Sequence, residues 1–447
     1  MKRALVVASL AALVAPASAF AHASVLSTHP TYRERLDQSP ASVWVRFDQG
    51  VEALPGSIVV QTANGIVVSR ATRNAADPAT ISAPVRKLPR GAYTVRWHAM
   101  SSDGHVVSGV WTFGVGVAAP PPTEAYGASG PTRTEHFVRW AYFLALALVI
   151  GGLGFRLLIV RGPLPPRAES RFFKTIGLGI VGVLEVGIVA FMLRAEDALQ
   201  LPFGRLLYGD LSPVASGTRF GTAFIGMTLG FALVAALIYL SWLLERRAFL
   251  WAALAIALVF ASGLSLAGHQ AADAGSSWKS ELADWVHLSA ASLWLGGLVQ
   301  LALVIWPAAP ELRRQAFLRF ARLAPVLIAV LVLAGVYLSV LRLPHVSDLW
   351  TQSYGHVLLV KLSLVSVALG WGGLHHVFAR PLVERGDSRA LGLLSRSLVG
   401  EAAVGMSVLL VAAILVDSKP PLRPAPTQAR LSGSQPLSVG NAVNVRP

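Results

Sequence analysis

Eight long apolar stretches after residue 136 constrain the fold of this chain more than any other feature of its sequence. They lie near residues 137–160, 172–193, 220–243, 248–267, 283–306, 323–341, 356–378 and 397–416. At 1.5 Å per residue, each is long enough to cross a hydrocarbon core about 30 Å thick. Hydrophobic residues make up 54% of the 447 positions and charged residues 14%, a composition too apolar for a soluble protein of this size. We therefore predict an all-α bundle of eight transmembrane helices over residues 136–416.

The first 21 residues have the pattern of a secretory signal peptide. Two basic residues precede an apolar run that ends in the small-residue pattern AFA at 19–21, and these are the three regions of such a signal. Cleavage after Ala21 would leave His22 as the first residue, whereas the competing pattern ASA at 17–19 would leave Phe20 first. The residues that follow are then expected outside the cytoplasm.

Between the signal and the first apolar stretch, apolar residues alternate along the chain. In SVWVRF at 42–47 every second side chain is apolar, and the same holds for Tyr93, Val95 and Trp97 in AYTVRWHAM. SIVVQTANGIVVSR has the pattern of a hairpin about Asn64-Gly65. This period of two is typical of strands, so we predict an all-β sandwich or barrel over residues 22–116.

Two other segments show no periodic pattern. Residues 117–135 are rich in Pro, Gly and Ala, so we expect a linker there. Residues 417–447 begin with a Pro-rich run, and we expect them to form a disordered tail.

The basic residues between the apolar stretches predict the orientation of the bundle. If the β domain is exported, the connections expected inside carry fourteen Lys and Arg residues, and those expected outside carry five. The inside group is Arg161, Arg167, Arg171, Lys174, Arg246, Arg247, Arg313, Arg314, Arg319, Arg322, Arg380, Arg385, Arg389 and Arg396. The outside group is Arg194, Arg205, Arg219, Lys279 and Arg342. Cytoplasmic loops carry such an excess, so we predict a multi-pass protein of the bacterial inner membrane, with the β domain and the C-terminal tail periplasmic.

The overall composition excludes several classes of site. Cysteine is absent, which leaves nitrogen, oxygen and methionine sulfur as metal ligands. The net charge of +15 comes from arginines spread between the apolar stretches, which argues against a nucleic-acid partner. A Gly-rich phosphate loop ending in Lys-Ser/Thr is also absent, so we expect no ATP. We identify no catalytic residues and expect no enzyme activity.

Two short motifs in the predicted β domain together suggest a copper site. In SSDGH at 101–105, Asp103 and His105 fall on one face of an extended chain, because side chains repeat every two residues. Alone, such a motif is more often a turn than a ligand set. A free N-terminal His22, however, would offer both its α-amine and its ring Nδ1 to one ion. Three nitrogens and one oxygen suit tetragonal Cu(II).

On these motifs, residues 22–116 resemble the CopC family. The resemblance is carried by HASVLSTHP and by LPRGAYTVRWHAMSSDGHVVSGVWTFGVG. It implies a periplasmic copper-binding domain with a cupredoxin-like β-barrel, in which His22, Asp103 and His105 bind Cu(II). Some members add a Met-rich Cu(I) loop, but FDQGVEALPGSIVV contains no Met, so we expect no thioether site within this domain.

Polar residues inside the apolar stretches are costly in lipid, so they are functional candidates. Asp284 and His287 lie three residues apart in ELADWVHLSAASLWLGGL, and we expect Asp284 to orient the His287 ring. His269, and His356 with Lys361, lie near the outer ends of other stretches. We expect these imidazoles to converge in the outer leaflet as a copper-receiving site. Interfacial hydrogen bonding is the alternative for His269 and His356.

Two glutamates and three methionines occupy other stretches. We expect Glu185 and Met192, seven residues apart, to share one helix face, with Glu185 paired to a cation, carrying a proton or neutral. Glu401 is expected near the inner end of the eighth stretch. Met192, Met227 and Met406 are more often packing residues than ligands, although Met192 is kept as a candidate beside Glu185.

The membrane half resembles the CopD family of inner-membrane copper proteins. The resemblance is carried by GHQAAD, ADWVHLSAASLWLGGL, YGHVLLVKLSLV and LSRSLVGEAAVGMSVLLVAAIL, and it is clearest after residue 260. It places His269, His287, Lys361 and Glu401 in the family's patterns. Relatives tend to show Asn where this chain has His375-His376. For this His pair, an exit site for copper and an interfacial pair are both open interpretations. A CopC head fused to a CopD bundle is similar to the YcnJ type of copper-uptake protein.

Together these features predict a copper-binding inner-membrane protein. The head would capture Cu(II), and the bundle would receive and translocate copper, for import or for copper homeostasis and resistance, with Cu(I) as an option in the membrane domain. The expected partners are the copper ion, the lipid bilayer and a periplasmic copper chaperone. Two alternatives stay open: a redox membrane protein with haem held by paired imidazoles, and a copper buffer or sensor that transports nothing.

Overall fold

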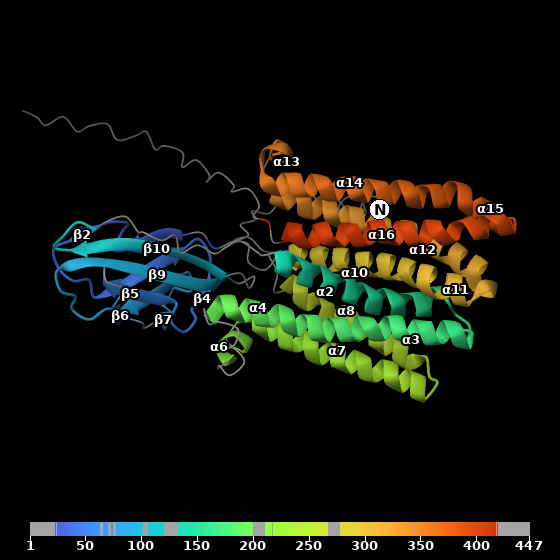
Figure 1. The fold of residues 1–447 in the computed structure, drawn as a ribbon, viewed down its shortest axis with the longest axis horizontal. Coiled ribbons are helices and arrows are strands. Elements are labelled where there is room, and N and C mark those ends of the chain that lie inside the picture. Colours follow the sequence, from blue (N-terminus) through green and yellow to red (C-terminus); the bar gives the residue numbers. More distant parts are fainter. Residues whose placement is uncertain are drawn as a thin grey trace, which may run out of the picture.

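A β domain is followed by a helical bundle, as predicted (Figure 1). The computed structural model describes residues 23, 25–62, 66–69, 73–74, 77–101, 106–119, 133–199, 211–216, 218–266, 278–343, 345–416 and 418. The predicted signal peptide, most of the predicted linker, and all of the predicted tail except residue 418 lie outside these residues.

Two sheets form the β domain. Its described strands are β1 (Val25–His29), β2 (Arg35–Leu36), β3 (Ser42–Phe47), β4 (Val51–Glu52), β5 (Ile58–Thr62), β6 (Val67–Ser69), β7 (Arg73–Asn74), β8 (Thr80–Pro84), β9 (Gly91–Ser101) and β10 (Val106–Val115). One sheet has the order β1-β3-β8-β7, and the other has the order β2-β10-β9-β5-β6, with β4 also paired to β9. Strand β2 runs parallel to β10, while β9 and β10 form a long antiparallel pair.

The alternating apolar residues build the core between these sheets. Val43, Val45 and Phe47 of β3 are buried, as are Val95 and Trp97 of β9. The Phe47 and Trp97 rings meet edge to face, with 5.2 Å between their centroids. This is the packing expected when every second side chain of a strand points to one face.

Eight helical stretches in the described part of the chain are long and apolar enough to cross a membrane. They are α2 (Arg133–Gly154) with η1 (Phe155–Ile159); α3 (Pro166–Val181) with η2 (Gly182–Val186) and α4 (Gly187–Leu199); α7 (Arg219–Leu243); α8 (Ala248–Leu266); α10 (Trp278–Gln300) with η3 (Leu301–Ile305) and α11 (Trp306–Ala308); η4 (Pro310–Leu312) with α12 (Arg313–Arg342); α14 (Ser353–Leu374) with η5 (His375–Ala379) and α15 (Arg380–Glu384); and α16 (Ser388–Val416). Two short helices, α6 (Ser212–Ala215) and α13 (Asp348–Thr351), lie in connections. The predicted multi-pass architecture is thus confirmed.

Helices α2 and α10 form the centre of the bundle. The apolar windows of their spans are 83% and 78% buried, against 33% or less in each of the other six. Glycines allow their backbones to touch: a Cβ on Gly296 would lie 1.8 Å from the Ala147 carbonyl oxygen, and one on Gly151 would lie 2.3 Å from that of Ser292. Small residues permit such close helix packing in lipid.

Four spans contain a π-helical turn, namely η1, η2, η3 and η5. A π turn adds a residue to the local repeat and rotates everything beyond it around the helix axis. Side chains on either side of such a turn therefore do not share the face that a regular helix would give them.

Several arginines of the predicted inner connections bind carbonyls at helix ends. Arg247 donates to the carbonyls of Arg156 and Val160, both at 3.0 Å, and Arg319 donates to Ile159 O at 2.8 Å. The last carbonyls of a helix lack intrahelical partners and carry partial negative charge. These arginines therefore stabilise helix ends in addition to any role in orientation.

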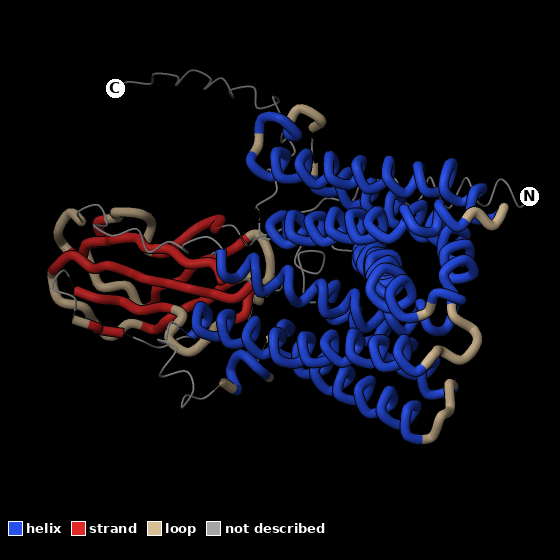
Figure 2. The backbone as a smooth tube through the Cα atoms, turned by 45° about the vertical axis from the view of Figure 1, so that its right-hand side comes forward, coloured by secondary structure: helices blue, strands red, loops and turns tan. Residues whose placement is uncertain are grey.

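The β domain lies at one end of the bundle (Figure 2). The two are in contact through an apolar cluster, called here the junction cluster. Its buried members are Leu54 and Met100 from the β domain, Phe191 and Ala195 from α4, and Val214 from α6. Val106, Met192, Leu211, Ala215, Phe220 and Phe224 pack against them. Strands β9 and β10 both contact α4, so the end of the β9–β10 pair that carries residues 101 and 106 faces the helices.

Candidate functional site

The predicted Cu(II) ligands of the head, His22, Asp103 and His105, lie outside the described residues, and so does His269. The residues that flank the three head ligands nevertheless come together. Ala23, which follows His22, is buried in the core of the head. Ser101 ends β9 and Val106 begins β10, on the two sides of the SSDGH motif.

A short chain of pairings connects these flanks. Val25 pairs with Phe47 at the end of β3. Two residues later, Gln49 donates a hydrogen bond from Nε2 to Ser101 Oγ at 3.3 Å, and Val51 pairs with Ser101. The start of β1 and the end of β9 therefore lie at the same end of the sandwich, which is also the end that carries the junction cluster.

His287 lies well inside helix α10. This helix begins at Trp278, nine residues before His287, which corresponds to about 14 Å along the helix at 1.5 Å per residue. Its Nδ1 lies 3.0 Å from Leu331 O on α12. A carbonyl only accepts, so Nδ1 carries the proton and Nε2 keeps its lone pair, the form in which imidazole binds metals. Gly335 makes room for the ring, since a Cβ there would lie 3.1 Å from His287 Cε1.

Asp284 does not orient the His287 ring, which corrects the expectation from their spacing. The Asp284 carboxylate instead accepts a hydrogen bond from Ser265 Oγ on α8 at 2.7 Å. Three residues turn a helix by about 300°, so side chains at this spacing are about 60° apart. Helix α10 lies between α8 and α12, and the two side chains bond to different neighbours.

Lys361 completes a charged group at this level of the bundle. It lies on α14, close enough for its charge to act on both Asp284 and His287. Arg342, at the end of α12, acts on Lys361 as well. Charged side chains from α10, α12 and α14 thus lie within electrostatic range of one another here. We call Asp284, His287 and Lys361 the outer cluster.

His356 takes no part in the outer cluster. It is exposed on α14, and its Nε2 lies 2.8 Å from Trp350 O at the neighbouring α13. Among the described residues, no group of three or more His, Asp or Glu side chains could hold a metal ion. The expected convergence of His287 and His356 is therefore not found, because the turn through α13 gives His356 a local partner.

Glu185 and Met192 lie in different surroundings. Glu185 lies within η2 and is exposed on the surface of the bundle, while Met192 packs against the junction cluster. Between them, Ile188 and Val189 are exposed as well, at the spacing of one helix face. The shared face expected for the two side chains stays a prediction.

Glu401 forms a buried pair with His375, which the sequence left without a partner. Glu401 Oε2 lies 2.8 Å from His375 Nδ1, and the two side chains are 5% and 12% exposed. His375 Nε2 lies 2.7 Å from Ser397 Oγ, which also accepts a hydrogen bond from Trp371 Nε1 at 2.9 Å. Because α16 begins at Ser388, nine residues before the predicted stretch, Glu401 lies near the middle of its helix rather than at its inner end.

The chain positions contained a signal for this pair. Helices α14 and α16 are neighbours joined through a turn that includes Gly386, whose φ is +84°. His375 precedes Gly386 by 11 residues and Glu401 follows it by 15. In an antiparallel pair, residues at similar distances from the turn lie at similar depths.

Comparison with known families matches three parts of the chain. Residues 25–116 match the CopC domain. Residues 134–279 match the N-terminal domain of the copper resistance protein D-like family, and residues 314–415 match copper resistance protein D. Within the outer cluster, His287 lies between the matches to residues 134–279 and 314–415, and Lys361 lies inside the match to 314–415.

Three curated relatives show the same division. The copper transport protein CutJ of Bacillus subtilis is 27% identical over 92% of this chain and 76% of its own length. Copper resistance protein D of Pseudomonas syringae is 28% identical over 62% of this chain and 92% of its own length. Copper resistance protein C of the same species is 31% identical over 24% of this chain and 89% of its own length.

Proposed function

The chain belongs to the family of CopC–CopD fusions, and from this premise we propose that its head captures Cu(II) outside the cytoplasm and that its bundle receives copper and carries it inward. One observation carries the proposal. The strand ends that flank the predicted ligand motif pack on α4, at the end of the bundle that receives the head. Copper released from the head would enter the membrane domain directly, without diffusing through the periplasm.

The head site of this proposal consists of His22, Asp103 and His105. Its support is the convergence of their described neighbours through Phe47, Gln49 and Ser101. Signal cleavage after Ala21 would complete the site, because only then does His22 have an α-amine to donate.

The membrane route of this proposal uses two polar groups at successive depths. The outer cluster offers the Nε2 lone pair of His287 about 14 Å from the start of α10. We propose that His269 belongs to it as well, because Ser265, four residues earlier in the sequence, bonds to Asp284 of this cluster. The pair of Glu401 with His375 follows, about 22 Å from the outer end of α16. Glu185 and His356, both exposed, stay peripheral candidates.

Haem ligation is not favoured by the described imidazoles. Two histidines that hold a haem must each offer a free ring nitrogen from facing helices. His375 has both ring nitrogens within hydrogen-bond distance of side chains and so offers none, while His356 is exposed on α14 and lies apart from His287. The purified protein should therefore show no Soret band.

A Cu(II) titration of the processed full-length protein tests the head site. The matched variant carries a Met inserted between Ala21 and His22, which blocks the α-amine of His22 and leaves every other residue unchanged. Because one chelating nitrogen is lost, the Cu(II) affinity should fall by more than about tenfold, or about 1.4 kcal/mol. Equal affinities in the two proteins would remove His22 from the site.

A further inference from the structure

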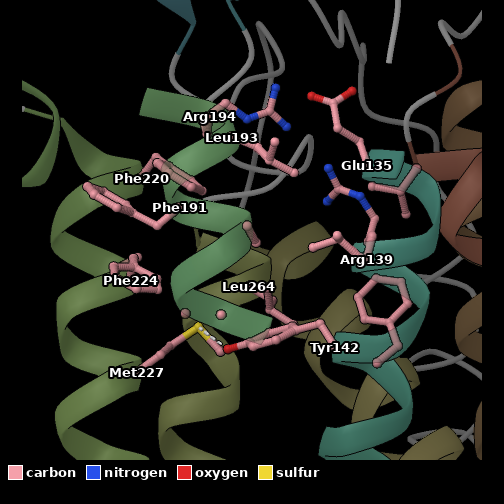
Figure 3. A pocket seen from close by; sticks show the side chains of 17 residues that line it. Glu135, Arg139, Tyr142, Phe191, Leu193, Arg194, Phe220, Phe224, Met227 and Leu264 are labelled. Atoms are coloured by element: carbon pink, nitrogen blue, oxygen red, sulfur yellow. Dashed lines mark hydrogen bonds between the residues drawn. The ribbon is translucent and has the colours of Figure 1, made fainter. Parts of the chain in front are cut away.

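A cavity opens beneath the junction cluster, between α2, α4, α7 and α8 (Figure 3). Glu135, Arg139 and Arg194 lie at its open end, whereas Tyr142 and Met227 lie at its far end. Phe191 and Phe224 line the wall between them, with ring centroids 4.7 Å apart. Both phenylalanines also belong to the junction cluster or pack against it, so the cavity and the head share a wall.

Met227 presents its sulfur at the end of this cavity. It lies eight residues into α7, about 12 Å from the start of that helix. The Tyr142 hydroxyl donates to Met227 Sδ across 4.0 Å. The side chain also lies against Gly263 of α8, where a Cβ would come within 2.9 Å of the sulfur. The thioether is thus held between three helices, and its cavity is otherwise lined mainly by apolar and aromatic side chains.

Two other methionines lie at the junction itself. Met100, the residue before Ser101 in β9, is fully buried in the junction cluster, and Met192 of α4 packs against that cluster. Met192 follows Phe191, which lines the cavity. Of the four methionines that follow the predicted signal peptide, three therefore lie at the contact between head and bundle or directly beneath it.

We propose that Met100 and Met192 form one Cu(I) station at the junction and that Met227 forms a second in the cavity. This inference rests on the proposed function. Thioethers are soft, neutral ligands that select Cu(I) over Cu(II), and the chain has no cysteine to supply any other sulfur. The junction site needs one thioether from each domain, so neither domain would form it alone. It accepts Cu(I) rather than the Cu(II) that the N,N,N,O set of the head selects, so an external thiol would have to reduce the released copper first. Two Cu(II) and two thiols then give two Cu(I), one disulfide and two protons.

X-ray absorption of the Cu(I)-loaded full-length protein tests this assignment. Because the chain lacks cysteine, any copper–sulfur scattering must come from methionine. Ag(I), which is soft, monovalent and redox-silent, provides the parallel affinity measurement. We expect copper–sulfur scattering in the parent protein. We also expect each of M100L, M192L and M227L to reduce that scattering in part. Each should weaken Ag(I) binding at its own station at least tenfold and leave the other station unchanged.

M406L is the matched control, since Met406 lies on α16 and packs against the main core of the bundle. Met and Leu have similar volumes, so all four variants should fold, and M406L should bind Ag(I) like the parent. The Cu(II) affinity of the same samples reports the head separately. Absent copper–sulfur scattering, or an M406L effect as large as that of M227L, would overturn the thioether stations. If the Cu(II) site then persists with its dependence on His22, the proposed function survives. If neither the Cu(II) site nor copper–sulfur scattering is found, both the proposed function and the thioether stations are wrong.

Discussion

At the scale of single residues, the pair of Glu401 and His375 is the most informative feature. A carboxylate held in lipid is costly unless it is paired and hydrogen-bonded. Here Oε2 of Glu401 lies 2.8 Å from Nδ1 of the imidazole, and Oγ of Ser397 contacts the other ring nitrogen, Nε2. Glu185, also in a span, is exposed instead. The two glutamates therefore predict a large and a small loss of stability for the same substitution.

We expect Glu401→Gln to lower both thermal stability and copper transport, because the amide removes the charge that pairs with His375. The loss of stability should be about 1–3 kcal/mol, typical of a hydrogen bond to a charged group. Glu185→Gln, the matched control, should change stability by less than about 0.5 kcal/mol. Thermal unfolding in detergent measures both variants, and equal shifts would contradict the importance of the pair.

The sequence identified Glu401 and His287 as candidates but not their partners. Both stood out because polar groups inside apolar stretches are rare. Their contacts depend on rotations of about 60° around a helix axis, which residue spacing alone assigns poorly. For this reason Asp284 was expected beside His287 but bonds to Ser265, and the acceptor for His287 is a backbone carbonyl, which no motif could have indicated.

At the scale of helices, the contact of α2 with α10 determines how the bundle packs. The Cβ that Gly296 lacks would sit 1.8 Å from the Ala147 carbonyl oxygen, which is backbone and cannot rotate away. Gly370 on α14 has open space instead, with nothing within 4 Å of an added Cβ. The two glycines therefore serve different purposes in the same kind of helix.

Gly296→Ala should destabilise the protein by about 1–3 kcal/mol, because the added methyl group forces the two central helices apart. Gly370→Ala should be neutral or stabilise by up to about 1 kcal/mol, since alanine has the higher helix propensity. The readout is the melting temperature of each purified variant. A Gly296→Ala protein as stable as the parent would show that the central helices do not pack so closely.

The spans themselves could be predicted from hydropathy, whereas their internal turns could not. All eight apolar stretches correspond to helices, because the bilayer sets the necessary length and composition. The π turns within four of them add single residues and leave no trace in hydropathy. One of these turns contains Glu185, and another begins at His375.

At the scale of the whole molecule, the proposed orientation rests on the distribution of basic residues and can be measured directly. The natural absence of cysteine makes the chain a ready background for single-cysteine labelling. Lys87 is exposed on the β domain, and Arg389 is exposed near the start of α16. In intact cells a membrane-impermeant maleimide should label Lys87→Cys and leave Arg389→Cys unlabelled until the cells are permeabilised. The reverse pattern would invert the proposed topology.

The contact between head and bundle is the feature that sequence reasoning could least anticipate. The alternating pattern of the head and the apolar stretches of the bundle each predicted their own domain. The junction cluster, however, combines Met100 with Phe191 and Val214, residues that no local pattern relates. Each is apolar and unremarkable in its own segment, so only the three-dimensional arrangement shows that the end of the head that carries the predicted copper motif faces the membrane domain.

Copper accumulation by right-side-out membrane vesicles tests the central claim most directly. Vesicles that carry the parent protein are compared with vesicles that carry the Asp103→Ala/His105→Ala variant, at limiting external copper and equal protein level. The account predicts uptake by the parent vesicles and a rate at least about tenfold lower for the variant, since the bundle then loses its supply from the head. Equal rates in the two preparations, or no uptake by either, would contradict delivery of copper from the head through the bundle.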